Sequence, residues 1–307
     1  MRVTVIGASG FIGRHLSAGL RGRGDEVVEA SLRNVGAAAQ ACEGSDAIVQ
    51  LAGAPVITRW SARAKDEIRR SRVDATRALV AALSQLGARP TVYVNASAVG
   101  YYGASETATF TESSPPGDDF LAQVCVEWEH EASRAAEFGM RVACIRTGIV
   151  LGRDGGALAR LLPIFKAGLG GIIGNGRQWS SWIHIDDVVG IYLLAIDRAE
   201  NALNATAPEP VRNVDLTWAL ASALHRPAFL PAPAFALHLM FGEGASVLTT
   251  GQRVLPERTL SLGYEFAYPQ IGPALASAVS SLRQPAPLGL EYANIADDPR
   301  ASSPPKG

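Results

Sequence analysis

The amino-terminal stretch RVTVIGASGFIGRHL, residues 2–16, decides the fold. Its apolar run VTVI ends in a GxxGxxG pattern formed by Gly7, Gly10 and Gly13. Glycines let backbone amides approach a pyrophosphate closely, and the amino terminus of a helix adds partial positive charge. The stretch therefore predicts a strand, a dinucleotide-binding turn and a helix, with an ordinary glycine-rich turn as the alternative. The expected cofactor-binding residues here are Gly7, Ser9, Gly10, Phe11, Ile12 and Gly13.

Beyond this turn, apolar β-rich runs alternate with helical patterns through the first half of the chain. The expected strands are residues 3–6, 26–30, 47–51, 92–95 and 142–146, and the expected helices are residues 12–21, 62–86 and 120–138. Nearly continuous apolar strands in this order are typical of a parallel sheet covered on both faces. We therefore predict an α/β fold: a doubly wound, Rossmann-like parallel sheet with a smaller mixed C-terminal lobe.

The pattern changes along the second half. Residues 1–215 are expected to form the dinucleotide-binding, Rossmann-like domain, with the glycine-rich residues 153–180 contributing to a substrate lobe. Regular alternation stops near residue 216, where prolines divide short helical segments, so residues 216–284 are expected to form a small substrate or cap domain. The polar residues 285–307 are expected to be a mobile tail.

Composition limits the partners and the compartment. The 307 residues are 48% hydrophobic and 19% charged with a net charge of −1, and the basic residues are scattered, which argues against nucleic-acid binding and favours a small-molecule substrate. Three cysteines without a CxxC pair or histidine spacing predict no metal site and a reducing compartment. The chain begins directly with the first predicted strand, so we expect no signal segment. Arg160, Pro163 and Lys166 interrupt the longest apolar stretch, so we expect a cytoplasmic protein without a membrane partner.

The tip of the second strand indicates which dinucleotide binds. An acid there would accept a hydrogen bond from the adenosine ribose, whereas a base would neutralise a 2′-phosphate. The tip reads Ser31-Leu32-Arg33, and the nearest acid, Glu29, lies two positions too early within the strand. We therefore predict NADP(H) bound through Ser31 and Arg33, with NAD as the alternative. Arg14 either lies near the phosphate or belongs to the solvated surface.

Several motifs taken together resemble the extended short-chain dehydrogenase/reductases, the group that contains sugar-nucleotide epimerases and dehydratases. These motifs are GASGFIG, LAGAP at 51–55, RVDATRAL at 72–79, VNASAVGYYG at 94–103, IRTGIVLG at 145–152 and WIHIDDV at 182–188. Residues 229–269 resemble the small terminal domain of an atypical branch whose substrates are largely unassigned. The resemblance covers nearly everything except the tail.

In active members of that group, a tyrosine and a lysine four residues later exchange the proton and hold the ribose, and a serine at the end of the fourth strand orients the substrate oxygen. The serine position matches Ser97, but Leu121 and Cys125 stand where the tyrosine and lysine belong, and Glu129 fits the acid that follows. Leucine cannot transfer a proton, and a thiol is mostly neutral at pH 7. Ordinary tyrosine-based ketoreduction is therefore not expected.

The resemblance implies further cofactor contacts. Arg72 stands where the group commonly has asparagine and could supply the positive charge lost at Cys125, to cofactor or to an acidic substrate. The alternative is a helix-surface arginine paired with Glu67 or Asp74. The remaining expected cofactor-binding residues are Leu51, Ala52, Gly53, Glu67, Arg72 and Ile149.

Catalytic candidates are Ser97, Cys125 and Tyr102, each with a structural alternative. Cys125 lies on an apolar helical stripe and is either packing or chemistry. Tyr101 or Tyr102 could supply a phenol, although aromatic packing explains both. Two tryptophans, Trp179 and Trp182, could line a substrate pocket or fill the interface between the lobes. His184, Asp186 and Asp187 fit a loop-stabilising and helix-capping role, so no metal site is proposed there.

Two functions remain open from sequence. The first is an NADP(H)-binding oxidoreductase or epimerase-like enzyme, acting on a small carbonyl, hydroxyl or nucleotide-sugar-like substrate without the usual tyrosine and lysine. The second is a non-catalytic NADP(H)-binding sensor or scaffold that reports to a protein partner. The glycine turn with Ser97 favours the first, and the loss of both catalytic residues favours the second.

Overall fold

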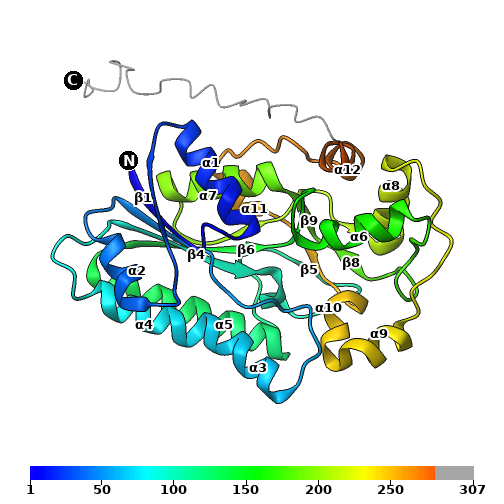
Figure 1. The fold of residues 1–307 in the computed structure, drawn as a ribbon, viewed down its shortest axis with the longest axis horizontal. Helices are drawn as coiled ribbons and strands as arrows, with labels where there is room; N and C mark the ends of the chain where they lie inside the picture. Colours follow the sequence, from blue (N-terminus) through cyan, green and yellow to red (C-terminus); the bar gives the residue numbers. More distant parts are fainter. Residues whose placement is uncertain (281–307) are drawn as a thin grey trace, which may run out of the picture.

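A six-stranded parallel sheet forms the centre of the computed structural model, which describes residues 1–280 (Figure 1). The order across the sheet is β10-β6-β4-β3-β1-β2. These strands are β1 (Arg2–Ile6), β2 (Glu26–Ala30), β3 (Ala47–Gln50), β4 (Val92–Ala98), β6 (Arg141–Thr147) and β10 (Asn201–Ala205). The Rossmann-like α/β fold is confirmed, whereas the tail expected at 285–307 lies outside the described residues.

The sheet reverses its winding direction beside β1. The chain passes from β1 to β2 on one side and then returns to place β3 on the other, so that Val5 lies level with both Glu29 and Val49. Parallel sheets bind ligands outside the carboxyl ends of their strands at such a switch point. The fold therefore places the predicted turn after β1 at the position where a dinucleotide is expected.

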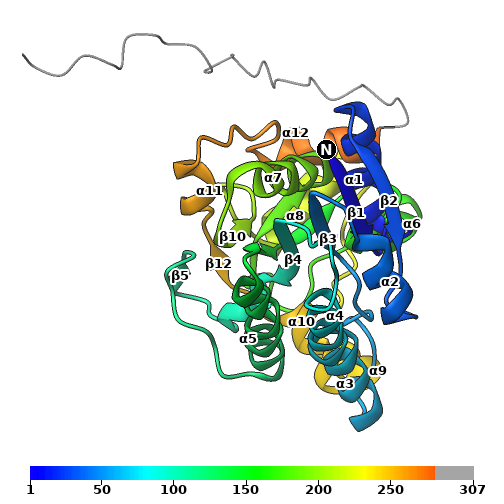
Figure 2. The same cartoon turned by 90° about the vertical axis from the view of Figure 1, so that its left-hand side faces the viewer.

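Helices cover both faces of the sheet (Figures 1 and 2). One face packs against α1 (Phe11–Gly22) and α7 (Ile185–Arg198), through buried side chains such as Leu16 and Ile191. The other face packs against α2 (Val35–Cys42), α4 (Ala75–Leu83) and α5 (Phe120–Ser133), which continues as a 3₁₀ turn, Arg134–Phe138. Two buried faces account for the continuous apolar character of the strands.

The long helix expected at 62–86 is divided. It begins as α3 (Ala62–Arg69), widens into a π-helical turn, Arg70–Asp74, and continues as α4. π-helical turns within α-helices occur frequently at functional sites. Arg72 is at the centre of this turn, so the irregularity changes the direction of that side chain.

A second core lies in the smaller lobe. It joins Trp182 to residues of α6 (Gly156–Lys166), α8 (Asn213–Ala223) and α12 (Ile271–Val279). Short paired strands border it: β7 (Ile149–Leu151) with β9 (Trp182–His184), and β8 (Trp179–Ser180) with β11 (Val211–Arg212). Because this core draws on both halves of the chain, the lobe is assembled from segments far apart in sequence.

The C-terminal segment returns to the main sheet. β12 (Arg253–Val254) pairs with β5 (Thr109–Phe110), and α11 (Glu257–Ser261) lies beside edge strand β10. The Thr259 hydroxyl donates to the carbonyl of Asn204 at 3.0 Å. Farther along, the buried Asp187 carboxylate accepts hydrogen bonds from the backbone amides of Ala267 at 2.8 Å and Tyr268 at 3.0 Å. The remaining elements are α9 (Ala234–Phe241), a 3₁₀ turn (Gly242–Ala245) and α10 (Ser246–Thr249).

Candidate functional site

The turn after β1 depends on glycine at two positions. Gly7 has φ of +88°, and a Cβ there would lie 3.1 Å from the backbone nitrogen of Ala52. A Cβ on Gly13 would clash with the Gly7 carbonyl oxygen and lie 2.8 Å from the Cα of Ala8. Helix α1 starts at N-cap Gly10 with no side-chain cap and no acidic residue in its first turn. A tightly folded, uncapped helix amino terminus fits a pyrophosphate group.

Phe11 and its neighbours also support a second loop. The Phe11 ring fills the space beside Gly152 and Gly155: an added Cβ on Gly152 would lie 2.6 Å from the Phe11 Cζ, and one on Gly155 would clash with the ring. The Asp154 carboxylate of that loop lies 3.0 Å from His15 Nε2 and 3.3 Å from Arg14 Nη2. The loop between β7 and α6 is therefore fixed against the first turns of α1.

Arg72 lies at the end of β3, next to the cofactor turn. A Cβ on Gly53 would lie only 3.0 Å from the Arg72 Cζ, so glycine provides the space for the guanidinium. The guanidinium lies 5.3 Å from the Trp128 ring centroid and donates to the Ile68 carbonyl at 3.3 Å. Burial lowers the pKa of Arg72, partly offset by the nearby Cys125.

No carboxylate pairs with Arg72 among residues 1–280. Asp74, one of the two partners considered from sequence, instead binds Arg69 at 3.4 Å and Arg77 at 3.2 Å. Glu67 is exposed on α3. A half-buried cation without an anionic partner is favourable only if an anion or a polar ligand reaches it.

The end of β2 is open to solvent. Ser31 and Arg33 are both exposed, and the Ser31 hydroxyl accepts a weak 3.4 Å hydrogen bond from the Arg33 backbone amide. Glu29 binds Arg21 at 2.7 Å, which removes the only nearby acid from the tip. Among the described residues, Arg33 has no ion-pair partner, and its charge is therefore available to an anion.

Ser97 is part of a buried polar network. It is 5% exposed at the end of β4, and its hydroxyl donates to the Glu129 carboxylate at 2.6 Å. Arg146 on β6 donates to both Glu129 oxygens at 2.8 Å. Burial lowers the pKa of Arg146, but Glu129 and Tyr102 more than compensate, so the pKa is raised overall. Because the proton of Ser97 is directed to Glu129, the serine oxygen can act toward the site only as an acceptor.

Cys125 lies beside this network and is also buried. Burial and the Glu129 charge raise its pKa to about 12, against the opposing effects of Arg72 and of hydrogen bonding with Ala98 and Ser97. The thiol is therefore neutral at physiological pH, and a neutral thiol is a poor base and nucleophile. Leu121, one turn earlier, borders the backbone at Gly100.

Tyr102 is held at the other end of the network. Its hydroxyl donates to Asn204 Oδ1 at 2.7 Å and accepts from Arg146 at 3.0 Å. Burial raises the pKa of Tyr102 to about 12, although Arg146 and Asn204 act in the opposite direction. The Tyr101 ring lies 3.4 Å from the Arg146 guanidinium carbon. Both tyrosines thus pack around Arg146.

The remaining sequence candidates occupy structural positions. Trp179 lies 3.7 Å from the Arg212 guanidinium carbon, and Trp182 is fully buried in the second core. His184 accepts from the Asp186 amide at 3.2 Å as the N-cap of α7, and burial lowers its pKa to about 4. Within residues 1–280 no group of histidine, cysteine and acidic residues could hold a metal ion.

Sequence reasoning missed Arg146, Glu112 and Asn204 in this network. Glu112 accepts from the Asn204 amide at 3.0 Å and from the Arg258 amide at 3.1 Å. An arginine within the apolar strand sequence of β6 was the available signal, because a charge buried in a parallel strand needs a partner. Ile149, a cofactor candidate, lies 36% exposed at the start of β7.

Comparison with known proteins agrees with this geometry. The profile of the NAD dependent epimerase/dehydratase family matches residues 3–207. The chain belongs to that family. A second profile, a domain of unknown function (DUF1731), matches residues 232–278 of this family member.

Relatives of this epimerase/dehydratase chain span nearly its whole length. The chloroplastic SDR39U1 homologue of Arabidopsis thaliana is 45% identical over 90% of this chain and 86% of its own. The crystal structure of human SDR39U1 (isoform 2) with NADPH has a TM-score of 0.87 at 36% identity, covering 92% of this chain and 100% of the human chain. A nucleoside-diphosphate sugar epimerase from Corynebacterium glutamicum has a TM-score of 0.73 at 34% identity, covering 90% of this chain and 57% of its own.

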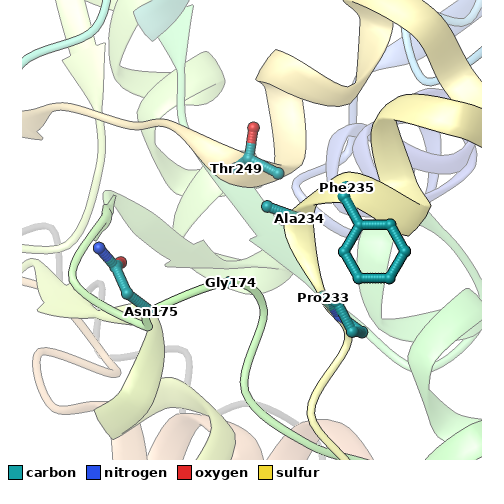
Figure 3. A pocket seen from close by; sticks show the side chains of 6 residues that line it. All are labelled: Gly174, Asn175, Pro233, Ala234, Phe235 and Thr249. Atoms are coloured by element: carbon teal, nitrogen blue, oxygen red, sulfur yellow. The ribbon is translucent and has the colours of Figure 1, made fainter.

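Two pockets open on the family member's surface. One, of about 510 Å³, is lined by Gly174, Asn175, Pro233, Ala234, Phe235 and Thr249 in the smaller lobe (Figure 3). The other, of about 650 Å³, is lined by residues of α5, β6 and β10, among them Glu129, Cys144 and Arg146. The second pocket therefore opens onto the polar network that holds Ser97. No helix within residues 1–280 has the length and apolar character needed to cross a membrane.

Proposed function

We propose that this protein binds NADP(H) and acts as an oxidoreductase or epimerase-like enzyme that does not use the family's tyrosine and lysine. The observation that carries the proposal is the Arg72 cation. It is half-buried beside Gly53 at the end of β3, and no carboxylate among the described residues pairs with it. The human structure, which is 36% identical to this chain, contains NADPH, and this supports NADP(H) as the anion that Arg72 would bind.

The proposed cofactor site extends along the carboxyl ends of β1, β2 and β3. The α1 amino terminus with Ser9, Gly10, Phe11, Ile12 and Gly13 would hold the pyrophosphate. Ser31 and Arg33 would contact the 2′-phosphate, and Arg72 would replace the positive charge that a lysine supplies from α5 in related enzymes. The further contacts proposed from sequence are Leu51, Ala52, Gly53, Glu67 and Ile149.

The chain's own residues limit the proton chemistry. Bound NADPH would supply a hydride. Cys125 and Tyr102 each have a pKa of about 12, and the Tyr102 hydroxyl already has two partners. Ser97 can accept but not donate toward the site. We therefore assign the proton exchange to solvent water and give Ser97 the role of accepting a hydrogen bond from a substrate hydroxyl.

The substrate in this proposal is a small hydroxyl, carbonyl or nucleotide-sugar-like molecule. The C-terminal lobe, with residues 153–180 and 216–280, would cover it as a cap, and the pocket beside Thr249 opens on that lobe. We retain a cytoplasmic location for this chain as part of the proposal, although one plant relative is chloroplastic.

Calorimetry with NADPH and NADH tests the cofactor assignment. We expect NADPH to bind about tenfold more tightly than NADH, because only NADPH carries the phosphate that faces Arg33. Consumption of NADPH would then be followed with a panel of carbonyl compounds and nucleotide sugars. Turnover that falls when Ser97 is replaced by alanine would support the enzyme, and binding without turnover across the panel would contradict it.

A second function is favoured by one feature of α5. Leu121 and Cys125 leave the helix without a proton donor or a fixed cation, and Ser97 is held by Glu129. A non-catalytic sensor of NADP(H) for a protein partner would need no more than the cofactor site. For this alternative, the double variant Leu121→Tyr with Cys125→Lys would retain partner binding, and a bound substrate beside the nicotinamide would exclude it.

A further inference from the structure

The smaller lobe has an unusually apolar surface. Eight of the twelve exposed large apolar side chains in residues 1–280 come from two segments, 155–185 and 216–242. Six of them are more than half exposed and define what we call the apolar rim. The apolar rim consists of Leu169, Phe229, Leu230, Phe235, Leu239 and Met240. Scattered apolar residues are normal on a surface, but this concentration marks an interaction site.

Helix α9 forms the most prominent part of the apolar rim. Its sequence AFALHLMF is apolar on all sides, yet none of its residues is buried, and Phe235 and Leu239, one turn apart, are each 76% exposed. Helices of this composition are normally enclosed by protein or lipid. Figure 1 shows α9 at the end of the molecule opposite α2, and Figure 3 shows the Phe235 ring pointing away from Asn175.

The helix is anchored to the body of the protein at its carboxyl end. Arg59 donates to the Leu239 carbonyl at 2.9 Å, and the Trp60 amide donates to the Phe241 carbonyl at 3.3 Å. Lys65 adds an ion pair with Glu243 immediately after the helix. The outward apolar face is therefore a fixed feature of the folded chain.

Two loops bring the rest of the apolar rim together. The Leu230 amide donates to the Gly170 carbonyl at 3.2 Å, and a Cβ on Gly168 would lie 4.0 Å from Pro227. The loop after α6 and the loop after α8 thus lie side by side. Leu169 consequently belongs to the same surface as Phe229 and Leu230.

The charged residues within the two segments of the apolar rim are all basic. Neither residues 155–185 nor residues 216–242 contain an aspartate or glutamate, although the chain as a whole has 29 acidic residues and a net charge of −1. The two segments contain Arg160, Lys166, Arg177 and Arg226, all exposed. Outside the segments, Glu243 directly follows α9 and pairs with Lys65, and Glu106 pairs with Arg177. Arg160, Lys166 and Arg226 have no acidic partner among residues 1–280, and an exposed apolar surface with such unpaired cations matches an anionic surface with an apolar layer below it.

We propose that the apolar rim is a peripheral membrane-docking surface, with α9 lying in the headgroup region of an anionic phospholipid layer. A second copy of this chain fits less well, because a two-fold contact would bring Lys166 and Arg226 of both copies together without any acid in these segments to pair with them. The proposal departs from the sequence-based expectation of no membrane partner, and it requires no membrane-spanning helix.

Flotation of the full chain with lipid vesicles tests this docking. We expect the protein to float with vesicles of phosphatidylcholine and phosphatidylglycerol at low salt, and to bind about tenfold less to pure phosphatidylcholine. The double variant Phe235→Ser with Leu239→Ser should reduce binding to the anionic vesicles by about tenfold or more. Both side chains are three-quarters exposed, so the variant should fold and bind NADPH as the parent does.

A matched control and a charge variant complete the test. Leu260 is 46% exposed on α11, and Leu260→Ser should leave vesicle binding unchanged. Lys166→Glu with Arg226→Glu should weaken binding to anionic vesicles only. The proposal is overturned if the parent does not float with anionic vesicles at low salt, if the Leu260→Ser variant loses binding equally, or if light scattering shows a dimer that Phe235→Ser with Leu239→Ser dissociates.

Discussion

The β1–α1 turn and helix α5 face the same end of the sheet but differ in how they are built. In the turn, the important contacts involve backbone atoms: Gly7 and Gly13 are held so closely that an added Cβ meets Ala52 or Ala8. In α5, function in related enzymes depends on two side chains, and this chain has Leu121 and Cys125 at those positions. The turn keeps the family's arrangement, whereas the helix keeps only its location.

This difference shows which functions a fold can lose independently. A backbone cradle is changed only by altering the packing of β1, α1 and β3 together, because each glycine touches a neighbouring segment. A catalytic side chain can be replaced while the helix continues to pack through Val124 and Trp128. We therefore expect this chain to keep cofactor binding by the β1–α1 turn while lacking proton transfer by α5 side chains, and the following experiments test that contrast.

Changing Gly13 to alanine should have the largest effect. The added methyl would overlap the Gly7 carbonyl oxygen, so we expect about 1–3 kcal/mol of lost stability and at least ~100-fold weaker NADPH binding by calorimetry. Gly22→Ala, in the last position of the same helix, is the matched control because nothing lies within 4 Å of its Cβ. Equal NADPH affinity in the two variants would show that the backbone packing around Gly13 does not determine cofactor binding.

Changing Arg72 to methionine should have the next largest effect. Losing hydrogen bonds to a charged group costs about 1.5–3 kcal/mol, or roughly 10- to 150-fold in NADPH affinity. Arg72→Lys should retain part of the NADPH affinity, because lysine keeps the positive charge but lacks the planar guanidinium group. Thermal melting should show little loss for either variant, because the guanidinium has only weak protein partners. A strong loss of stability with unchanged NADPH affinity would make Arg72 structural.

Changing Arg33 to alanine should reduce the preference for NADPH over NADH. The side chain is exposed, so we expect about a tenfold loss for NADPH and no change for NADH, measured in parallel titrations. The difference should shrink at high salt because exposed charges are screened. A fall of the same size for both cofactors would place Arg33 away from the 2′-phosphate.

Changing Cys125 to serine should have the smallest effect on NADPH binding, within about twofold.

In the parent chain, burial raises the pKa of both Cys125 and Cys42 from 9.0 to about 12, so the folded protein holds these protons more tightly than the unfolded chain does. The resulting stability is complete below about pH 9 and is lost as the pH rises toward 12.

Denaturant titrations between about pH 9 and 12 would measure this loss of stability. Alkylation of the native protein near pH 8 should be roughly 1000-fold slower than that of the unfolded chain, because so little thiolate is present. Rapid labelling of Cys125 in the native state would instead identify it as a reactive thiol.

Much of the fold could be predicted because the apolar patterns are strong. All five strands expected from sequence are present, and the glycine turn lies where the first of them ends. The edge strand β10 was missed because NALNA contains two asparagines, and the partners of the Asn204 side chain, the Tyr102 hydroxyl and the Leu255 carbonyl, lie far away in sequence. The break in the helix at Arg70–Asp74 was also missed, because no proline or glycine marks a π-helical turn.

The site was less accessible to sequence reasoning. The missing tyrosine and lysine could be recognised by counting from Ser97, but the partner of Ser97 could not, because Glu129 is 32 residues farther along the chain. Tyr102 appeared available as a phenol until its partners Arg146 and Asn204 were visible. Buried polar networks depend on pairs from several elements, which a single sequence does not specify.

The hydrogen bonds from Ala267 and Tyr268 to Asp187 join the two profile matches, which end and begin 25 residues apart, into one folding unit. A chain cut after the first match would keep Asp187 at the start of α7 but lose the amides that it binds, and a buried carboxylate without donors is strongly unfavourable. A truncation at the apparent boundary at 207 would therefore destabilise the remaining domain. The terminal segment is therefore bound to the main domain through Asp187, and transferring it to another protein would require transferring a buried carboxylate at the equivalent position as well.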